Sequence, residues 1–292
     1  MWFFRKQILP EIERNFQTPY FIDIQIQQSF EKNGFVVLHN IVSEEEINEA
    51  TEAFKQLQQM SAYNVTNKFE SAGNFICKDT QKFVFNFIKD YSSKIAPRFA
   101  NLDNCDIGEG GTFFIKPPTN ESILHPHQDS TVIDEVNHYG IFIWIPLTDI
   151  TLENGPLYVL SGSHKWGNVY RSQHIPWSFR NQYKYLWKKM TPITVKKGDI
   201  ICFDTSIIHA SGTNKTKEFR VAACGALLPK KHTKVEYLLK DKTIYKYNID
   251  NDYWLDGGQE NSLKNYTFET MDYNFPNPIS KKSIDQLISK YS

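Results

Sequence analysis

Three residues that can bind a divalent metal ion alternate in the segment His125-Pro126-His127-Gln128-Asp129. In an extended strand, alternate side chains point to the same face, so His125, His127 and Asp129 would project together. A histidine and a carboxylate supply two ligands, and the best candidate for a third is His209, 80 residues beyond Asp129. Two histidines and one carboxylate, with other coordination positions open, are the ligand set of non-haem Fe(II) oxygenases. The alternative is that His125 or His127 is an ordinary polar residue with no metal.

Arg220, eleven residues after His209, is followed by small residues at alternate positions. Arg220 begins an expected strand in which the alternate residues are all small: Ala222, Cys224 and Ala226. A guanidinium binds a carboxylate through a two-pronged fork that lysine cannot reproduce, so this pattern predicts a pocket for a small carboxylate. The alternative is a surface ion pair between Arg220 and Glu218.

The link between His209 and Arg220 is short. Ser211 and Gly212 open an expected turn between the strand that ends at His209 and the strand that begins at Arg220. We therefore expect a hairpin that brings His209 and Arg220 to one cavity, with the Ser211 hydroxyl as an additional donor.

The elements that must position these residues change in type along the chain. Capping signals and helical spacing predict helices over 24–34, 43–59 and 79–95, whereas strands are expected over 35–38, 112–116, 141–147, 157–160, 193–195, 198–203 and 219–228. Short strands separated by Gly, Pro and Asn favour a double-sheet sandwich with helices outside it. The predicted fold is mainly β with flanking helices, a double-stranded β-helix (jelly roll, cupin-like).

We expect one domain over residues 1–292. It would comprise a mostly helical part at 1–104, a jelly-roll core at 105–228 and a C-terminal extension at 229–292 that shows no chemical motif and closes with a helix near 280–290. Residues 1 to about 20 are expected to form a surface arm.

The segment 165–190 is rich in aromatic and basic residues and contains no acidic residue. Long insertions between core strands often form binding loops, so we expect a lid that contacts an anionic substrate group such as a carboxylate, a phosphate or a thioester carrier. Candidate contacts are Trp177, Arg171 and Arg180, together with His125. The alternative is a solvated basic loop held down by its aromatic residues.

The composition of the chain bears on its binding partners and on its location in the cell. The 292 residues include 33 basic and 33 acidic residues, which gives no support for nucleic-acid binding by net charge. The four cysteines are scattered and favour a reducing compartment over a disulfide framework. No stretch has the length needed to span a membrane, so a soluble cytoplasmic protein is expected, of open oligomeric state.

Several motifs together resemble the phytanoyl-CoA dioxygenase family of Fe(II)- and 2-oxoglutarate-dependent oxygenases. They are His127-Gln128-Asp129, Trp144 to Asp149, Glu153 to Leu157 leading to Ser161 to Lys165, and His209 to Asn214 followed by Arg220, eleven positions after His209. Each motif is weak alone, but their order and spacing are specific.

The resemblance implies that His127, Asp129 and His209 hold Fe(II). Arg220 and Ser211 would bind the distal carboxylate of 2-oxoglutarate, and we add Trp144 and Lys116 to this cosubstrate site. The expected reaction consumes O₂, releases succinate and CO₂, and hydroxylates an unactivated C–H bond of a small molecule. Halogenases of the family carry a small residue at the position of Asp129, so hydroxylation is the expected outcome.

Other readings of the same residues remain. A family member could desaturate or cyclise its substrate instead, and a non-catalytic jelly-roll protein could bind a ligand on the same scaffold. A zinc hydrolase of the metallo-β-lactamase type is disfavoured, because Ser130 stands where its motif has a histidine and an alternating βα pattern is missing.

Overall fold

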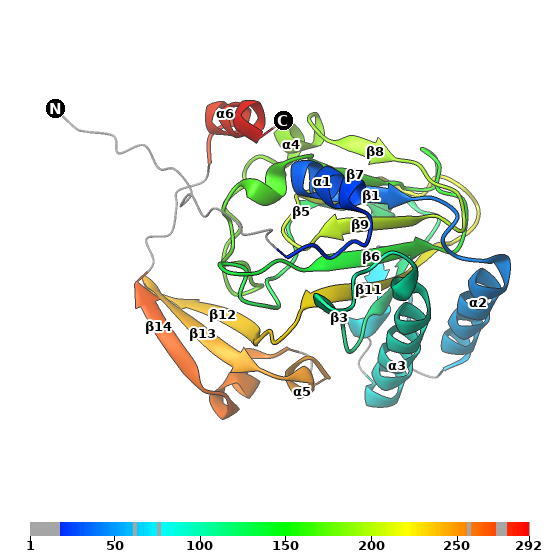
Figure 1. Ribbon diagram of the computed structural model, residues 1–292, viewed down its shortest axis with the longest axis horizontal. Helices are drawn as coiled ribbons and strands as arrows, with labels where there is room; N and C mark the ends of the chain where they lie inside the picture. The colour runs from blue at the N-terminus through cyan, green and yellow to red at the C-terminus, as the bar shows by residue number, and fades with distance from the viewer. Residues whose placement is uncertain (1–17, 61–62, 75–76, 256–257, 273–278, 292) are drawn as a thin grey trace.

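The computed structural model describes residues 18–60, 63–74, 77–255, 258–272 and 279–291. Two antiparallel sheets face each other as a sandwich, helices cover the outer face of the larger sheet, and a third sheet lies to one side (Figure 1). Of the expected N-terminal arm, residues 1–17 lie outside the described part. Tyr20 is not on the surface: it is buried and stacks on Tyr139 at 4.2 Å between ring centroids.

The larger sheet has the strand order β1-β9-β6-β11-β4-β2, with β3 paired to β11. Its strands are β1 (Phe35–Leu38), β2 (Glu70–Ser71), β3 (Cys105–Ile107), β4 (Thr112–Lys116), β6 (Ile141–Pro146), β9 (Ile200–Asp204) and β11 (Arg220–Pro229). The smaller sheet has the order β5-β10-β7-β8. Its strands are β5 (Leu124–His127), β7 (Leu157–Val159), β8 (Thr191–Ile193) and β10 (His209–Ser211). Strand β8 lies two residues earlier than the expected 193–195.

Three helices at the N-terminal end begin and end where the local signals predict. They are α1 (Ile24–Asn33), α2 (Glu44–Gln59) and α3 (Lys78–Ile95). Gly34 ends α1 with φ +80°, a conformation that suits glycine. Ser43 and Glu46 form the reciprocal capping box of α2. Short 3-10 helices are η1 (Ala72–Asn74), η2 (Ala96–Arg98), η3 (Asn120–Ser122) and η4 (Ser163–Lys165).

Strand β11 separates the two hydrophobic layers. Val221 and Ala223 pack in the cluster shared with the helices, whereas Ala222 and Cys224 pack in the cluster between the two sheets. This is the alternation expected for a strand with both faces buried. Arg220 shares the inner face, so a charged group stands at the end of the sandwich interior.

The C-terminal extension forms a third sheet that the sequence did not predict. Strands β12 (Lys234–Lys240), β13 (Thr243–Ile249) and β14 (Phe268–Asp272) pair antiparallel in that order. They enclose a short helix, α5 (Asn251–Leu255), and the 3-10 helix η5 (Glu260–Asn265). The expected closing helix is α6 (Lys281–Tyr291), which lies beside α4 (Tyr183–Trp187) in Figure 1. Its apolar residues pack in one hydrophobic cluster with Phe179.

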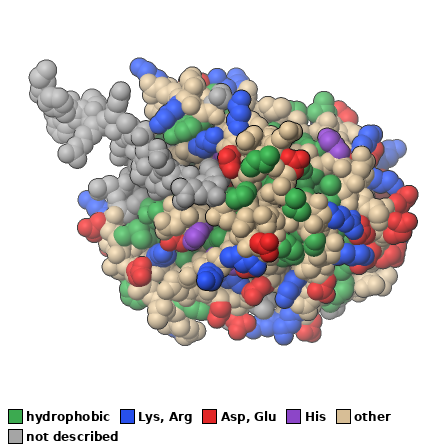
Figure 2. All heavy atoms as spheres, viewed as in Figure 1, with side chains coloured by type: hydrophobic (Ala, Val, Ile, Leu, Met, Phe, Trp, Pro, Cys, Tyr) green, Lys and Arg blue, Asp and Glu red, His purple; other side chains and the backbone are tan. Residues whose placement is uncertain are grey.

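The surface charge follows the balanced composition of the chain. Basic and acidic side chains are interspersed over the face shown in Figure 2. Within the described residues, no helix combines the length and apolar character that crossing a bilayer requires.

Helix α3 lies unusually close to the larger sheet, and glycine permits this. A Cβ at Gly111 would lie 2.2 Å from Ile88 Cγ2 and 2.3 Å from the Cys224 carbonyl oxygen. The Cys224 atom belongs to the backbone of β11, so it cannot move aside without disturbing the sheet that carries Arg220.

We expect Gly111→Ala to lower the free energy of unfolding by roughly 1–3 kcal/mol, the range typical of an overpacked core. Urea unfolding followed by circular dichroism measures this change. Gly73→Ala is the matched control, because its Cβ would meet its nearest atom at an ordinary 3.6 Å. Equal stability of the two variants would contradict the close approach of α3.

Candidate active site

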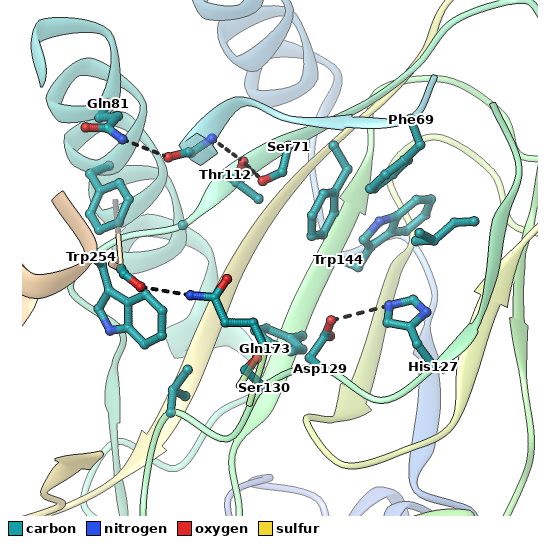
Figure 3. A pocket seen from close by; sticks show the side chains of 18 of the residues that line it. Phe69, Ser71, Gln81, Thr112, His127, Asp129, Ser130, Trp144, Gln173 and Trp254 are labelled. Atoms are coloured by element: carbon teal, nitrogen blue, oxygen red, sulfur yellow. Dashed lines mark hydrogen bonds and ion pairs between the residues drawn. The ribbon is translucent and has the colours of Figure 1, made fainter. Parts of the chain in front are cut away.

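The pairing of β5 with β10 brings two histidines together. His127 lies directly opposite His209, and their ring centroids are 4.2 Å apart. Asp129 follows the end of β5, with Oδ1 3.4 Å from His127 Nε2 and Oδ2 3.5 Å from His209 Nε2. One ligand atom from each residue lies within 4.8 Å of the others. The structure thus assembles the predicted triad at one point (Figure 3 shows His127 and Asp129).

Hydrogen bonds set the tautomer of both histidines. His127 Nδ1 lies 2.8 Å from the His125 carbonyl oxygen, and His209 Nδ1 lies 3.1 Å from the Ile207 carbonyl oxygen. A carbonyl can only accept, so each Nδ1 carries the proton and each Nε2 presents a lone pair. Both lone pairs are next to the Asp129 carboxylate, which is how histidine ligands are oriented around a metal.

Burial and charge keep Asp129 and His209 in the forms that bind a cation. For His127, burial acts to lower the pKa, but the hydrogen bond and the charge of Asp129 outweigh it and raise that pKa. Burial acts to raise the pKa of Asp129, but the charges of His209, His127 and Arg171 outweigh it and lower that pKa to about 2. Burial and the neighbouring His127 lower the pKa of His209 to about 4. Near neutral pH the site therefore holds an ionised carboxylate and a neutral His209, both ready to coordinate.

Arg171, a predicted substrate contact, instead holds the backbone at Asp129. Arg171 Nε donates to the Asp129 backbone oxygen at 2.8 Å. Its two terminal nitrogens bind the Glu135 carboxylate at 2.7 and 2.9 Å, and both side chains are almost fully buried. The expectation of a substrate contact was wrong for Arg171, because this ion pair occupies its guanidinium.

His125 is not part of the cluster, although simple alternation placed it there. Strands β5 and β10 pair at His127 with His209 and at Leu124 with Ser211, so β5 has one residue more than β10 between these pairs. This bulge breaks the alternation. Leu124 lines the same cavity as His127, whereas His125 is exposed and its ring lies 6.1 Å from that of Tyr183.

A second polar group faces this cavity. Arg220 is buried, with its guanidinium 5.3 Å from the ring centroid of Trp144. Its Nε and Nη1, and the Oγ of Ser211, have no hydrogen-bond partner within the described structure. Buried donors without a partner are costly, so these atoms are suited to an anionic ligand with two oxygens. An ion pair of Arg220 with Glu218 does not form.

Lys116 lies opposite Arg220 on β4. Its Nζ donates to the Ser122 carbonyl oxygen and lies over the Phe69 ring, 5.4 Å from the ring centroid. Burial and the neighbouring Arg220 lower the pKa of Lys116 to about 6. Arg220 is therefore the cation that faces the cavity at this end, with Lys116 packed beside it.

The expected hairpin between His209 and Arg220 was wrong. Strand β10 belongs to the smaller sheet, and β11 belongs to the larger sheet between β6 and β4. Both residues nevertheless line one cavity, because the two sheets face each other there.

Comparison with known proteins agrees with this geometry. The family model described as phytanoyl-CoA dioxygenase (PhyH) matches residues 30–222. The chain belongs to the phytanoyl-CoA dioxygenase family. Relatives include the peroxisomal phytanoyl-CoA dioxygenase of Mus musculus, 24% identical over 69% of this chain and 67% of that protein. The phytanoyl-CoA dioxygenase of Arabidopsis thaliana is also 24% identical, over 66% of this chain and 84% of that protein.

Solved structures confirm the fold. EctD from S. alaskensis superposes with a TM-score of 0.57 at 18% identity, covering 80% of this chain and 88% of that chain. The carbocyclase SnoK of nogalamycin biosynthesis superposes with a TM-score of 0.54 at 17% identity, covering 73% and 86%. The predicted jelly-roll fold and the predicted oxygenase class are confirmed, and a zinc hydrolase is set aside.

Segment 165–190 is held in place by its aromatic and apolar residues, and its role as a lid stays a prediction. Trp166, Phe179, Leu186 and Met190 pack with α6 against the smaller sheet. Trp177 donates through Nε1 to Gln128 at 3.0 Å, and Arg180 donates to the Trp177 carbonyl oxygen at 3.0 Å. None of the predicted substrate residues (His125, Arg171, Trp177, Arg180) lines the cavity. An anionic substrate stays a prediction, which the lining of this cavity does not support through these four residues.

The cavity has a volume of about 1100 Å³ and includes walls that motif analysis missed. Gln81 and Phe85 come from α3, Gln173 comes from segment 165–190, and Glu236, Trp254 and Gln259 come from the C-terminal extension. In Figure 3, Gln173 lies between Trp254 and Asp129, and its amide donates to the Gly258 carbonyl oxygen at 2.8 Å. No local pattern marks these residues, because they meet only through the docking of distant segments.

We expect Arg171→Met to lower the free energy of unfolding by about 3–5 kcal/mol, since it leaves the Glu135 carboxylate buried without its cation. Thermal and urea unfolding would measure the loss. Arg180→Met is the control in the same segment, because it removes a partly buried hydrogen bond to the Trp177 carbonyl oxygen and a change under about 1 kcal/mol is expected. Equal stability of the two variants would show that the Arg171–Glu135 pair does not support the residues around Asp129.

Proposed function

We propose that this protein uses Fe(II), 2-oxoglutarate and O₂ to hydroxylate a C–H bond of a small organic substrate. The observation that carries the proposal is a juxtaposition within one cavity. Two imidazole lone pairs and a carboxylate converge at one point, and a buried guanidinium with unpartnered donors faces the same space. The first set suits a divalent transition metal, and the second suits a carboxylate.

The residues present fit both groups. His127, Asp129 and His209 would hold the iron through three protein ligands and leave other positions open. Arg220 and Ser211 would bind the distal carboxylate of 2-oxoglutarate, with Trp144 packed on the guanidinium. When bound, the iron and 2-oxoglutarate supply oxidation by O₂, with succinate and CO₂ as coproducts.

The protein itself contributes position and environment. The hydrogen bonds from each Nδ1 keep both imidazoles turned toward Asp129. Apolar side chains around the cosubstrate end exclude water and strengthen the attraction between Arg220 and a carboxylate: Phe69, Phe114, Leu124, Phe142, Leu157 and Phe203. The solved neighbours are consistent with such a cavity, since the EctD structure contains 2-oxoglutarate and 5-hydroxyectoine.

The outcome of the oxidation is part of the proposal. Asp129 occupies the ligand position that halogenases of the family leave to a small residue, which favours hydroxylation. The carbocyclase SnoK has the same fold, so ring formation or desaturation is the second candidate. Product analysis by mass spectrometry separates them: hydroxylation adds one oxygen atom, whereas the others remove two hydrogen atoms.

The first test is spectroscopic and needs no substrate. Under anaerobic conditions, protein with Fe(II) and 2-oxoglutarate is expected to show the weak visible charge-transfer band of the chelate. Asp129→Ala should abolish the band by removing an iron ligand. Arg220→Ala should raise the Kd for 2-oxoglutarate by roughly 10- to 100-fold, because a charge-assisted fork is lost.

His125→Ala is the matched control for this test. It removes a histidine from the same motif but not from the cluster, so its band should equal that of the wild type. A wild type without a band, or a His125→Ala variant as impaired as Asp129→Ala, would overturn the proposed metal site.

A further inference from the structure

One wall of the cavity comes from a part of the chain beyond the family match, which ends at residue 222. Glu236 lies on β12, Trp254 lies on α5, and Gln259 follows them. The residues proposed to hold iron and 2-oxoglutarate lie at positions 127 to 220. The C-terminal wall therefore takes no part in the shared chemistry, and it borders the space left for a substrate.

Glu236 is the chemically distinctive residue of this wall. Its side chain is 1% exposed, yet it lines the cavity. Within the described chain, Ser172 is the side chain that donates a hydrogen bond to it, through Oγ to Oε1. No lysine or arginine among the described residues forms an ion pair with it.

The other buried glutamates among the described residues are each paired with an arginine. Glu135 is held by both terminal nitrogens of Arg171, and Glu46 is held in the same way by Arg98. Burying a carboxylate without a cation is costly, and natural proteins usually pair it. Burial raises the pKa of Glu236 to about 7, although hydrogen bonds from Ser172 and the Tyr237 backbone act in the opposite direction.

The other groups that line the cavity with Glu236 suit a cationic partner from outside the chain. Trp254 and Phe85 offer aromatic faces, which attract organic cations, and Gln173 and Gln259 offer amide groups. Apart from Arg220, the basic side chain among the described lining residues is Lys78, at the start of α3. The substrate space thus holds a buried acid without a matching buried base.

We propose that Glu236 recognises a positively charged nitrogen of the substrate, so that this enzyme oxidises an amine or a guanidine. The carboxylate would form a charge-assisted hydrogen bond with the ammonium or guanidinium group. That bond would hold the substrate by its charged end and present a neighbouring carbon to the iron. The inference rests on the proposed function, because it concerns the substrate of that same site.

The test uses binding of defined probes to the full-length protein loaded with Fe(II) and 2-oxoglutarate under anaerobic conditions. The amines are n-hexylamine, phenethylamine and agmatine. Their counterparts are n-hexanol and hexanoate for the first, 2-phenylethanol for the second and (4-hydroxybutyl)urea for the third. Isothermal titration calorimetry should show at least one amine binding the wild type tightly and its uncharged or anionic counterpart binding at least 10-fold more weakly.

Glu236→Gln removes the charge and keeps the shape. We expect it to weaken binding of that amine by roughly 10- to 100-fold while the chelate band stays unchanged. Glu260→Gln is the matched control, because Glu260 belongs to the same extension and pairs with Lys240 at the surface. It should bind the amine like the wild type.

The outcomes are distinguishable. If the wild type shows the chelate band but no amine binds better than its counterpart, the inference about Glu236 fails and the proposed function stands. The inference also fails if Glu236→Gln binds the amine as well as the wild type, as an amine that ligates the iron directly would. A wild type without the band defeats the proposed function itself.

Discussion

The register between β5 and β10 is the constraint on which the active site depends. It places His127 opposite His209, and the chain beyond β5 then needs only two residues to bring Asp129 to both imidazoles. Side chains alternate with a period of two, so a slip of one residue would turn a histidine away from the cavity. The bulge in β5 selects Leu124 and His127 for the inner face and sends His125 outward. The whole cluster follows from this one pairing.

The polar groups of the site lower the stability of the folded protein when no ligand is bound. Arg220 and Ser211 hold buried donors that have no partner within the part of the chain that the structure describes, and Asp129 brings a charge to the wall of the same cavity. Such groups lower stability unless a ligand satisfies them. The surrounding architecture offsets this cost with an apolar layer on each side of the larger sheet, one shared with the helices and one between the sheets. Arg171 and Glu135 add a buried pair that fixes the backbone at Asp129.

What the sequence could predict depends on how local each signal is. The capping box at Ser43, the glycine stop at Gly34 and the alternation along β11 involve neighbours in the chain, and the structure shows all three. The triad was also predictable, because its ligand types are rare together and its motifs resemble a known family. His125 was misplaced because a bulge depends on the partner strand. Arg171 was misassigned because Glu135, 36 residues away, cannot be paired with it from sequence alone.

The C-terminal extension shows how chemistry and selectivity are divided in this chain. The family-matched core carries every residue proposed to hold iron and 2-oxoglutarate, so that part is constrained by a reaction common to many substrates. The third sheet adds Glu236 to the wall of the cavity, outside the set of residues proposed to hold iron and 2-oxoglutarate. A buried carboxylate contributes little to the free energy of folding, and an apolar residue of similar size would often make the folded protein more stable. Its burial without an arginine partner among the described residues, where Glu46 and Glu135 each have one, is explained if the missing cation arrives with the substrate. Ligand binding would then satisfy the carboxylate and stabilise the folded protein.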